Sequence, residues 1–291
     1  MAYLTLKNTS LKKYNSLGLN VQAAQLYLPL DSQGLLEVLE LTKTTKRILI
    51  GKGCNILLTR EYYDESYAFI ITTMEDDLVL TETELIADAG VNLSRLAWFA
   101  LEQSLGGYAF LEDIPGTVGG ALIMNAGQYE FSFGQLVNWI DLYDTTTNTL
   151  SRIIPDKDYF TYRQSKISSH EIVIRAGLKT EPGNDEETLT AILKYKKDRY
   201  LKQPRKYPNA GSVFKRPYKE GQSYYVWKLF DEVELRGHQI GDAQVSEKHP
   251  GFIVNCGNAK PQDMVDLVKE CQKRVKEHFD IDLELEWKVI D

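Results

Sequence analysis

A glycine-rich run near the middle of the chain constrains the fold more than any other segment. It extends from Ile114 to Ala121 with the sequence IPGTVGGA, and Met124-Asn125-Ala126-Gly127 follows shortly after it. Three glycines and one proline within seven residues should not fit inside a regular helix or strand, so we expect a loop. Its small residues would let the backbone approach a ligand closely.

A second glycine segment, Gly51-Lys52-Gly53-Cys54-Asn55, lies upstream. Two loops that expose backbone N–H groups can hold a diphosphate, so the pattern indicates a bound dinucleotide. The mainly apolar segment Arg47–Ile50 predicts a strand directly before Gly51, and Asn55–Leu58 predicts another after it. A Rossmann site needs a helix after its glycine turn, and the pattern predicts none here, which argues against that fold.

The composition excludes several classes of protein. The chain has 291 residues, 43% of them hydrophobic, which is enough for a sizeable core and two or three domains. Acidic residues outnumber basic ones by 41 to 34, and a net charge of −7 argues against nucleic-acid binding through bulk electrostatics. The N-terminal residues are quickly polar and no apolar run could span a bilayer, so we expect a cytoplasmic protein without membrane insertion.

The cysteines and histidines indicate neither disulfides nor a metal site. Cys54, Cys256 and Cys271 are odd in number and lack metal-type spacing, so we expect no disulfide framework. The four histidines are scattered, without a paired motif, and we expect no bound metal.

Apolar spacing predicts the regular elements around the glycine segments. We expect helices that begin at Asp31-Ser32, near Leu93 (ending at Gly106-Gly107), at Asn184 and near Pro261, the last of them running to about Phe279. We expect strands at residues 69–71, 78–80, 85–87, 139–143, 171–174 and 283–287, with a hairpin turn at 145–148.

The helix that begins at Asn184 should bury an apolar stripe of Leu189, Ile192 and Leu193. Its C-terminal part is basic, from Lys194 to Arg199, and a solvated helix end that complements the helix dipole explains these charges. The prolines at 204 and 208 end the helix, and we expect a domain boundary there.

Several short motifs follow one another in a specific order. After GxGxN and IPGTVGGALxMNAG come YRxS at 162–165, AGSVFK at 210–215, GxxIGxxxVSxxHxGFIVN at 237–255 and LxxE at 283–286. Each alone has an ordinary explanation, such as a solvated loop arginine, a turn serine or an exposed strand glutamate. In this order and spacing, from about Asn8 to Trp287, the chain resembles the UDP-N-acetylenolpyruvoylglucosamine reductase (MurB) family.

The resemblance implies an α+β protein. The fold would be a split FAD-binding fold of the vanillyl-alcohol-oxidase/MurB type, with a C-terminal α+β substrate-binding domain. The domains would be residues 1–72, 73–200 and 201–283, and the strand 284–291 could return to the first. The short interval between Arg163 and Ser212 suits the shorter form of the family, which lacks an extra tyrosine loop.

The resemblance also implies a reaction with FAD and NADPH as cofactors. NADPH reduces the flavin, and the flavin then reduces UDP-N-acetylglucosamine enolpyruvate to UDP-N-acetylmuramate, a step of peptidoglycan synthesis. Hydride addition to the outer enol carbon leaves negative charge on the neighbouring carbon and its carboxylate, which the site must stabilise and protonate. By resemblance, Arg163 and Glu286 polarise the carboxylate and Ser212 donates the proton. Glu286 would have to be protonated or act through Arg163, because a second carboxylate would oppose the developing charge.

The remaining site residues are carried over in the same way. The residues expected to bind the cofactor are Gly51, Lys52, Gly53, Cys54, Asn55, Ile114, Pro115, Gly116, Thr117, Gly119, Gly120, Asn125, Ala126 and Gly127. The residues expected to bind the UDP-sugar are Tyr162, Lys202, Lys215 and Arg216, whose cations suit a diphosphate.

This chain departs from the family at several positions. Cys54 replaces a serine, Asp113, Trp227 and Asp242 stand where glycine is common, and Gln128 differs from the usual alanine. None of these is Arg163, Ser212 or Glu286. Two alternatives stay open: another flavin oxidoreductase on the same scaffold, and a non-catalytic protein that binds sugar nucleotides. We expect a monomer whose partners are the UDP-sugar and NADPH.

Overall fold

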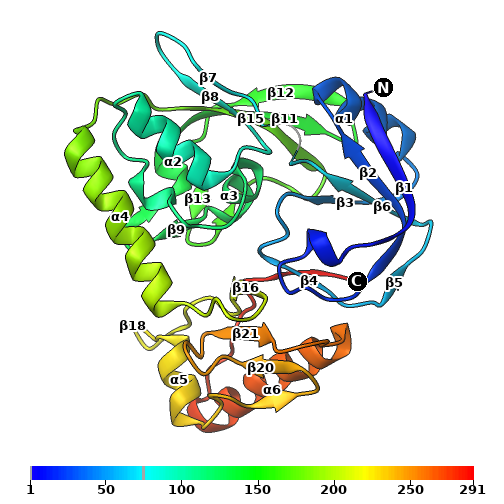
Figure 1. Ribbon diagram of the computed structural model, residues 1–291, viewed down its shortest axis with the longest axis vertical. Helices are drawn as coiled ribbons and strands as arrows, with labels where there is room; N and C mark the ends of the chain where they lie inside the picture. The colour runs from blue at the N-terminus through cyan, green and yellow to red at the C-terminus, as the bar shows by residue number, and fades with distance from the viewer. Residues whose placement is uncertain (1, 74–75) are drawn as a thin grey trace. The chain divides into compact units, whose positions relative to one another are not determined.

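The computed structural model describes residues 2–73 and 76–291 (Figure 1). The chain forms two compact units and passes between them several times. The first unit comprises Met1–Leu6, Leu26–Lys52 and Ser66–Arg199, and the second comprises Lys7–Gln25, Gly53–Glu65 and Tyr200–Asp291. The division into three domains expected from the sequence stays a prediction.

An antiparallel sheet of five strands is the centre of the first unit. Its order is β12-β11-β15-β8-β7, and every neighbouring pair is antiparallel. Side chains alternate across β15, where Val173 and Ala176 pack into one apolar core and Ile172 into another. The strands are β7 (Leu78–Leu80), β8 (Leu85–Asp88), β11 (Val137–Asp144), β12 (Thr149–Ile153) and β15 (Glu171–Leu178).

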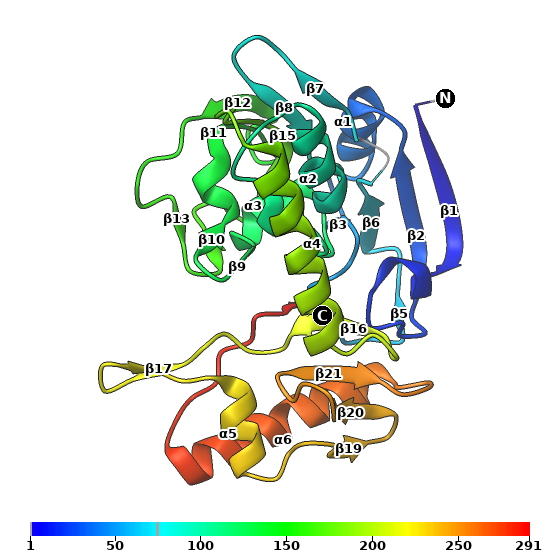
Figure 2. The ribbon, with the colours of Figure 1, turned by 60° about the vertical axis from the view of Figure 1, so that its left-hand side comes forward.

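Helices cover one face of this sheet. Leu96 and Ala97 of one helix and Leu122 of the next are buried in the larger core, and Figure 2 shows both helices beside the sheet. Besides α1 (Ser32–Leu41), the helices of the first unit are α2 (Leu93–Glu102), α3 (Val118–Met124) and α4 (Asp185–Lys202), and the last residues of α4 belong to the second unit. Short pieces complete it: β9 (Gly127–Gln128), β10 (Phe131–Ser132), β13 (Phe160–Thr161), β14 (Gln164–Ser165) and 3₁₀ turns at Ala109–Leu111 and Phe133–Leu136.

Side chains on the opposite face of β15 pack against a second layer, which consists of a helix and another sheet. Ile172 packs with Leu35, Val38 and Leu39 of one helix, and with Ile70 of a strand beneath it. In the second sheet the strand order is β1-β2-β6-β3, and β6 runs parallel to both β2 and β3. The elements are β1 (Tyr3–Ser10), β2 (Gln22–Pro29), α1 (Ser32–Leu41), β3 (Lys46–Ile50) and β6 (Tyr67–Ile71).

The second unit contains a four-stranded sheet of order β16-β21-β20-β19 with two helices (Figure 1). The last strand of the chain, β22, pairs in parallel with β4 far upstream. The elements of this unit are a 3₁₀ turn at Lys12–Tyr14, β4 (Ile56–Leu58), β5 (Tyr62–Tyr63), β16 (Asn209–Ser212), β17 (Tyr218–Lys219), β18 (Gln222–Ser223), α5 (Val226–Glu232), β19 (Gln239–Ile240), β20 (Ala243–Val245), β21 (Phe252–Asn255), α6 (Pro261–Phe279) and β22 (Lys288–Ile290).

Most of the predicted elements are confirmed. Asp31 caps α1 by accepting a hydrogen bond from the Gly34 N–H, and α6 has the predicted limits. No helix separates β3 from β4, as expected for a site that is not of the Rossmann type. Among the described residues, no helix has the length and apolar character needed to cross a membrane.

Three expectations about local structure are wrong. The glycine run is not all loop, because Gly119 and Gly120 lie in the first turn of α3. The final strand is at 288–290 rather than 283–287, where only Leu285 forms an isolated bridge. In α4 only Ile192 of the expected stripe is buried, since its neighbours 189 and 193 face solvent.

Candidate functional site

Gly51 and Thr117, one from each glycine segment, meet in the first unit. A side chain added at Gly51 would lie 2.5 Å from the Thr117 hydroxyl, so only glycine allows this approach. Thr117 caps α3, and its hydroxyl accepts a hydrogen bond of 3.4 Å from the Gly120 N–H. Gly119 also packs closely, although less so than Gly51, because an added Cβ would be 3.1 Å from the Cβ of Ala89.

The backbone N–H groups of this segment are mostly occupied. Val118 donates to the Val91 carbonyl at 2.9 Å and Gly119 to the Ala89 carbonyl at 2.8 Å. The N–H groups of Gly116 and Thr117 donate to no acceptor within residues 2–73 and 76–291. Of the N–H groups in this segment, only these two are left for an anion. The segment therefore offers a diphosphate fewer donors than the sequence led us to expect.

The other end of α3 holds the predicted arginine. Tyr162 and Arg163 form the two-residue turn between β13 and β14, and Arg163 has a φ of 56°. The Arg163 guanidinium donates to the Gly127 carbonyl at 2.9 Å. The Asn125 amide donates to the Thr161 carbonyl at 2.8 Å, which ties the turn to the end of the helix. Predicted cofactor-binding and catalytic residues are therefore neighbours here.

The residues before Ile114 are held by α4. Glu112 is buried, and its carboxylate accepts hydrogen bonds from the Trp98 indole at 3.0 Å and from Lys196 at 2.9 Å. Asp113 has a φ of 64°, which explains why glycine is more usual there, and its carbonyl accepts a bond of 3.0 Å from Arg199. Apart from the basic character of α4, no sequence pattern indicated these contacts.

In the second unit, Ser212 and Glu286 lie on neighbouring segments. The Glu286 N–H donates to the Val213 carbonyl at 2.8 Å, and the Asn55 amide donates to the Glu286 carbonyl at 2.9 Å. The indole of Trp287 donates to the Ala210 carbonyl at 2.9 Å. These bonds fix the backbone on both sides of Ser212, and they give Asn55 a role in holding a predicted catalytic residue.

Ser212 itself is exposed at the end of β16. Its hydroxyl forms no hydrogen bond with another described residue, so no protein group that activates it is evident. Gly211 before it has a φ of 76° at an irregularity in the pairing with β21. That backbone conformation strongly favours glycine and turns the serine side chain outward.

Gly53 and Cys54 are close to the turn at Lys12–Tyr14. An added side chain at Gly53 would lie 2.0 Å from the Tyr14 carbonyl oxygen. The Ser16 hydroxyl donates to the Cys54 thiol at 3.2 Å. All three cysteines of the chain are free thiols, and the described residues contain no cluster of His, Cys, Asp and Glu that could hold a metal ion.

The predicted phosphate-binding cations differ in their surroundings. Lys215 forms an ion pair of 2.5 Å with Glu284, which occupies its charge. Arg216 is exposed and forms no ion pair with a described carboxylate. Lys202 is exposed at the last position of α4. Lys52 is exposed between Gly51 and Gly53. Arg216 is therefore a better candidate than Lys215 for binding an anionic ligand.

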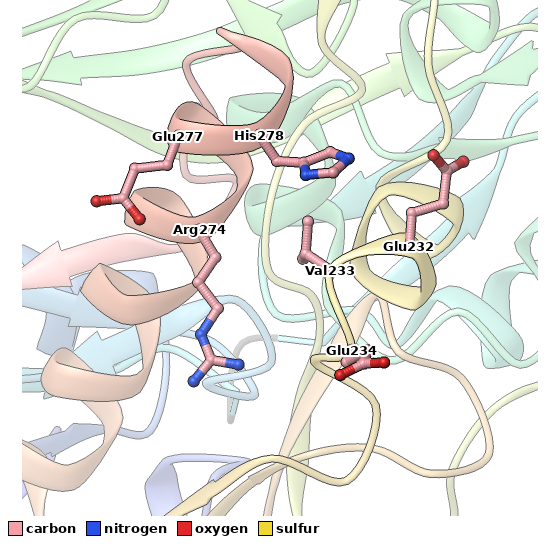
Figure 3. Close-up of a pocket in the computed structure, with 6 residues that line it drawn as sticks. All are labelled: Glu232, Val233, Glu234, Arg274, Glu277 and His278. Carbon is pink, nitrogen blue, oxygen red and sulfur yellow. The ribbon is translucent and has the colours of Figure 1, made fainter.

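A pocket of about 360 Å³ lies elsewhere in the second unit (Figure 3). It contains none of the predicted site residues. Three of its six lining side chains are glutamates, which repel anionic ligands, so we assign neither the cofactor nor a sugar nucleotide to it. Its lining residues are Glu232, Val233 and Glu234, at and just after the end of α5, and Arg274, Glu277 and His278 of α6.

Comparison with known proteins agrees with this arrangement. The family model for the C-terminal domain of UDP-N-acetylenolpyruvoylglucosamine reductase matches residues 203–290. The UDP-N-acetylenolpyruvoylglucosamine reductase of Caldanaerobacter subterraneus is 35% identical over 289 residues, 97% of this chain and 92% of that protein. The one of Thermotoga maritima is 34% identical over 278 residues, 95% of each.

The fold agrees as well. The crystal structure of MurB from Thermus caldophilus superimposes with a TM-score of 0.80 at 29% identity and covers 99% of both chains. The expected α+β fold of the MurB type is therefore confirmed. Since identity and coverage extend along almost the whole chain, the protein belongs to the UDP-N-acetylenolpyruvoylglucosamine reductase family of oxidoreductases.

Proposed function

We propose that this protein reduces UDP-N-acetylglucosamine enolpyruvate to UDP-N-acetylmuramate with FAD and NADPH. The observation that carries the proposal is that Glu286 is hydrogen-bonded to Asn55 and to Val213, the neighbour of Ser212, so that the second unit joins three distant parts of the sequence. Family membership supports the substrate, since the relatives are named for this reduction.

The glycine segments of the first unit fit a flavin dinucleotide. Gly51 lets the backbone of one glycine segment approach Thr117 of the other closely, and the N–H groups of Gly116 and Thr117 are available to an anion. Bound FAD would supply hydride transfer. The further residues that would hold it are the ones at 52–55, 114–115, 119–120 and 125–127.

The chain's own residues would handle charge and protons. Arg163 would bind the substrate carboxylate, with its guanidinium already oriented by the Gly127 carbonyl. As hydride reaches the outer enol carbon, the electron pair moves to the neighbouring carbon, and Ser212 Oγ would give its proton to that carbon. Glu286, whose backbone carbonyl accepts a hydrogen bond from the Asn55 amide, would act in its protonated form as a hydrogen-bond donor to the substrate.

The spectrum of the purified protein tests the proposal. The folded protein should carry or take up FAD, NADPH should bleach it without oxygen, and the enolpyruvyl substrate should restore the colour. A folded protein that takes up no flavin, or whose reduced flavin the substrate does not reoxidise, contradicts the proposal.

The role of Ser212 has its own test. Ser212→Ala should leave bleaching by NADPH unchanged and slow reoxidation by substrate at least about a hundredfold, the usual contribution of general acid catalysis. Ser151→Ala, at an exposed serine of β12, is the matched control and should change neither step. Equal slowing of both steps by Ser212→Ala would contradict a role in proton donation.

A further inference from the structure

The helix α4 is packed against the first unit along only a narrow part of its surface. Of its 18 residues, all of them described, only Ile192 is buried. The leucines at 189 and 193, which we expected to be buried, are 39% and 52% exposed. Figure 1 shows α4, in yellow-green, at the outer edge of the first unit. Since helices in proteins gain most of their stability from packing of an apolar face, this side of α4 favours a further partner.

Four exposed residues of α4 form one line along the helix. Glu186, Leu189, Leu193 and Lys197 follow one another at spacings of three, four and four residues, and such spacings keep side chains on one face of a helix. We call these four residues the α4 ridge. It has a negative charge at one end, a positive charge at the other, and two leucines between them.

The protein does not balance the two charges of the α4 ridge. Glu186 and Lys197 form no ion pair with another residue of the described ranges 2–73 and 76–291. They are eleven residues apart, which is about 16 Å along the helix axis and too far for an ion pair between them. The neighbouring Lys196 differs, because it pairs with the buried Glu112 at 2.9 Å.

The order of residues along the α4 ridge is complementary to itself. When two copies of α4 run antiparallel with Glu186 of each copy level with Lys197 of the other, Leu189 of each lies within one residue of Leu193 of the other. Two ion pairs then flank four leucines. A two-fold axis relates the two halves of such a contact, as it does in most homodimers. A parallel pair would instead bring like charges together.

An anionic lipid surface fits the α4 ridge less well than a second copy does. Helices that lie on such a surface usually carry cations along their polar side. The first turn of α4 carries Asp185, Glu186 and Glu187, which a negative surface repels.

We infer that two copies of this chain associate through the α4 ridge, antiparallel about a two-fold axis. The leucines of the two copies pack on each other, and the Glu186 carboxylate of each copy pairs with the Lys197 ammonium of the other. A contact between one helix of each copy is smaller than the roughly 1,200 Å² of a standard interface, so the dimer is weak and reversible. This inference replaces the monomer expected from the sequence. It does not depend on the proposed function, because the α4 ridge contains none of the predicted site residues.

Sedimentation equilibrium of the intact chain over a range of concentrations tests the inference. The wild type should show a reversible equilibrium between monomer and dimer. Leu193→Asp should weaken association at least about tenfold, because the two-fold axis buries the new charge twice. Leu150→Asp is the matched control, since Leu150 is 61% exposed on β12 of the same unit, and it should associate as the wild type does.

Exchanged charges test the antiparallel register. Glu186→Lys and Lys197→Glu should each weaken the dimer about fivefold, because each dimer then contains two like-charge pairs. The double variant Glu186→Lys/Lys197→Glu restores opposite charges and should associate as the wild type does. Added salt should weaken the wild-type dimer.

Several outcomes overturn the inference. One is a wild type that stays monomeric at the highest concentration that sedimentation can measure. Another is a dimer that Leu193→Asp leaves intact, since a different surface would then form it. A double variant that associates no better than the single ones contradicts the register. Binding of a monomeric wild type to vesicles of anionic phospholipid, abolished by Leu193→Asp, would assign the α4 ridge to a membrane instead.

The outcome is distinguishable from that of the proposed function. If the wild type shows the flavin cycle but no dimer forms, only the inference is wrong. If the dimer forms and responds to the variants as expected but no flavin cycle is seen, only the proposed function is wrong.

Discussion

His249 is a titratable side chain that packs against Phe252, the residue that pairs with Ser212. Its Nδ1 accepts a hydrogen bond of 3.2 Å from the Gly251 N–H, and its ring lies edge-on to Phe252 at 4.9 Å. Phe252 in turn pairs with Ser212. Burial, reinforced by the Arg236 cation, lowers the pKa of His249. The folded protein therefore holds this imidazole neutral, with Nδ1 as an acceptor.

We predict that stability falls on acidification because of this residue. The pKa of His249 is lower in the folded chain than in the unfolded chain, so the unfolded state takes up the proton first, and the free energy of unfolding decreases below about pH 6.5. In His249→Asn the amide oxygen can still accept from the Gly251 N–H but does not titrate, so the decrease should be smaller. Urea denaturation at several pH values measures it. His278→Asn is the control, and an equal change in both variants would refute the assignment.

The short helix α3 shows where local sequence rules fail. Glycine disfavours helix, so the run at 114–121 predicts a loop, yet Thr117 caps a helix whose second residue packs closely on Ala89. Propensity is a weak prior that such tertiary contacts override. The two glycines of the first turn differ, because a Cβ at Gly119 would crowd Ala89, whereas one at Gly120 would meet nothing nearer than 3.7 Å.

This difference gives a prediction for the helix. Gly120→Ala should stabilise the flavin-free protein by about 0.5–1 kcal/mol, because alanine loses less backbone entropy in a helix. Gly119→Ala should destabilise it, since Ala89 must move. If the proposed cofactor contact at Gly120 is correct, Gly120→Ala should also raise the Kd for FAD. Thermal denaturation and flavin titration measure both effects, and an unchanged Kd would remove Gly120 from the cofactor site.

Motif order in the sequence predicted Arg163, Ser212 and Glu286 as site residues, but not what holds them. Asn55 bonds to the Glu286 backbone across most of the chain, and no local pattern encodes such a pair. The wrong placement of the final strand at 283–287 has a similar cause, a contact between residues far apart in the sequence. Alternating apolar residues there report which side chains are buried, while the hydrogen-bonded partner β4 is available only to residues 288–290.

The contact between α4 and Glu112 should stabilise the first unit. Among the described contacts, Lys196→Met leaves the buried Glu112 carboxylate with the Trp98 indole alone, which should cost about 1–3 kcal/mol because the Lys196 side chain is itself 55% exposed. Lys197→Met, at an exposed neighbour, is the matched control and should be close to neutral. In Glu112→Gln the loss on removing Lys196 should shrink, since no buried charge is left. Equal losses in both Glu112 backgrounds would contradict the pairing.

At the scale of the whole molecule, the predicted residues are divided between the two units. Gly51, Thr117 and Arg163 belong to the first unit, and Ser212 and Glu286 belong to the second. Each unit is built from segments that are not contiguous in sequence, so neither can be expressed as one continuous piece. The intact chain is therefore the right object for a test of cofactor identity.

We predict that FAD stabilises the intact chain more than FMN or riboflavin does. A ligand that binds only the folded state adds about 2.7 kcal/mol at a hundred times its Kd, and the melting temperature should rise by several degrees. If the N–H groups of Gly116 and Thr117 hold a diphosphate, FMN and riboflavin, which lack it, should give smaller shifts at equal concentration. Thermal denaturation of the flavin-free protein with each ligand measures the order. ADP is the control for diphosphate binding without the flavin ring, and equal shifts with FAD and riboflavin would show that the glycine segments do not bind the diphosphate.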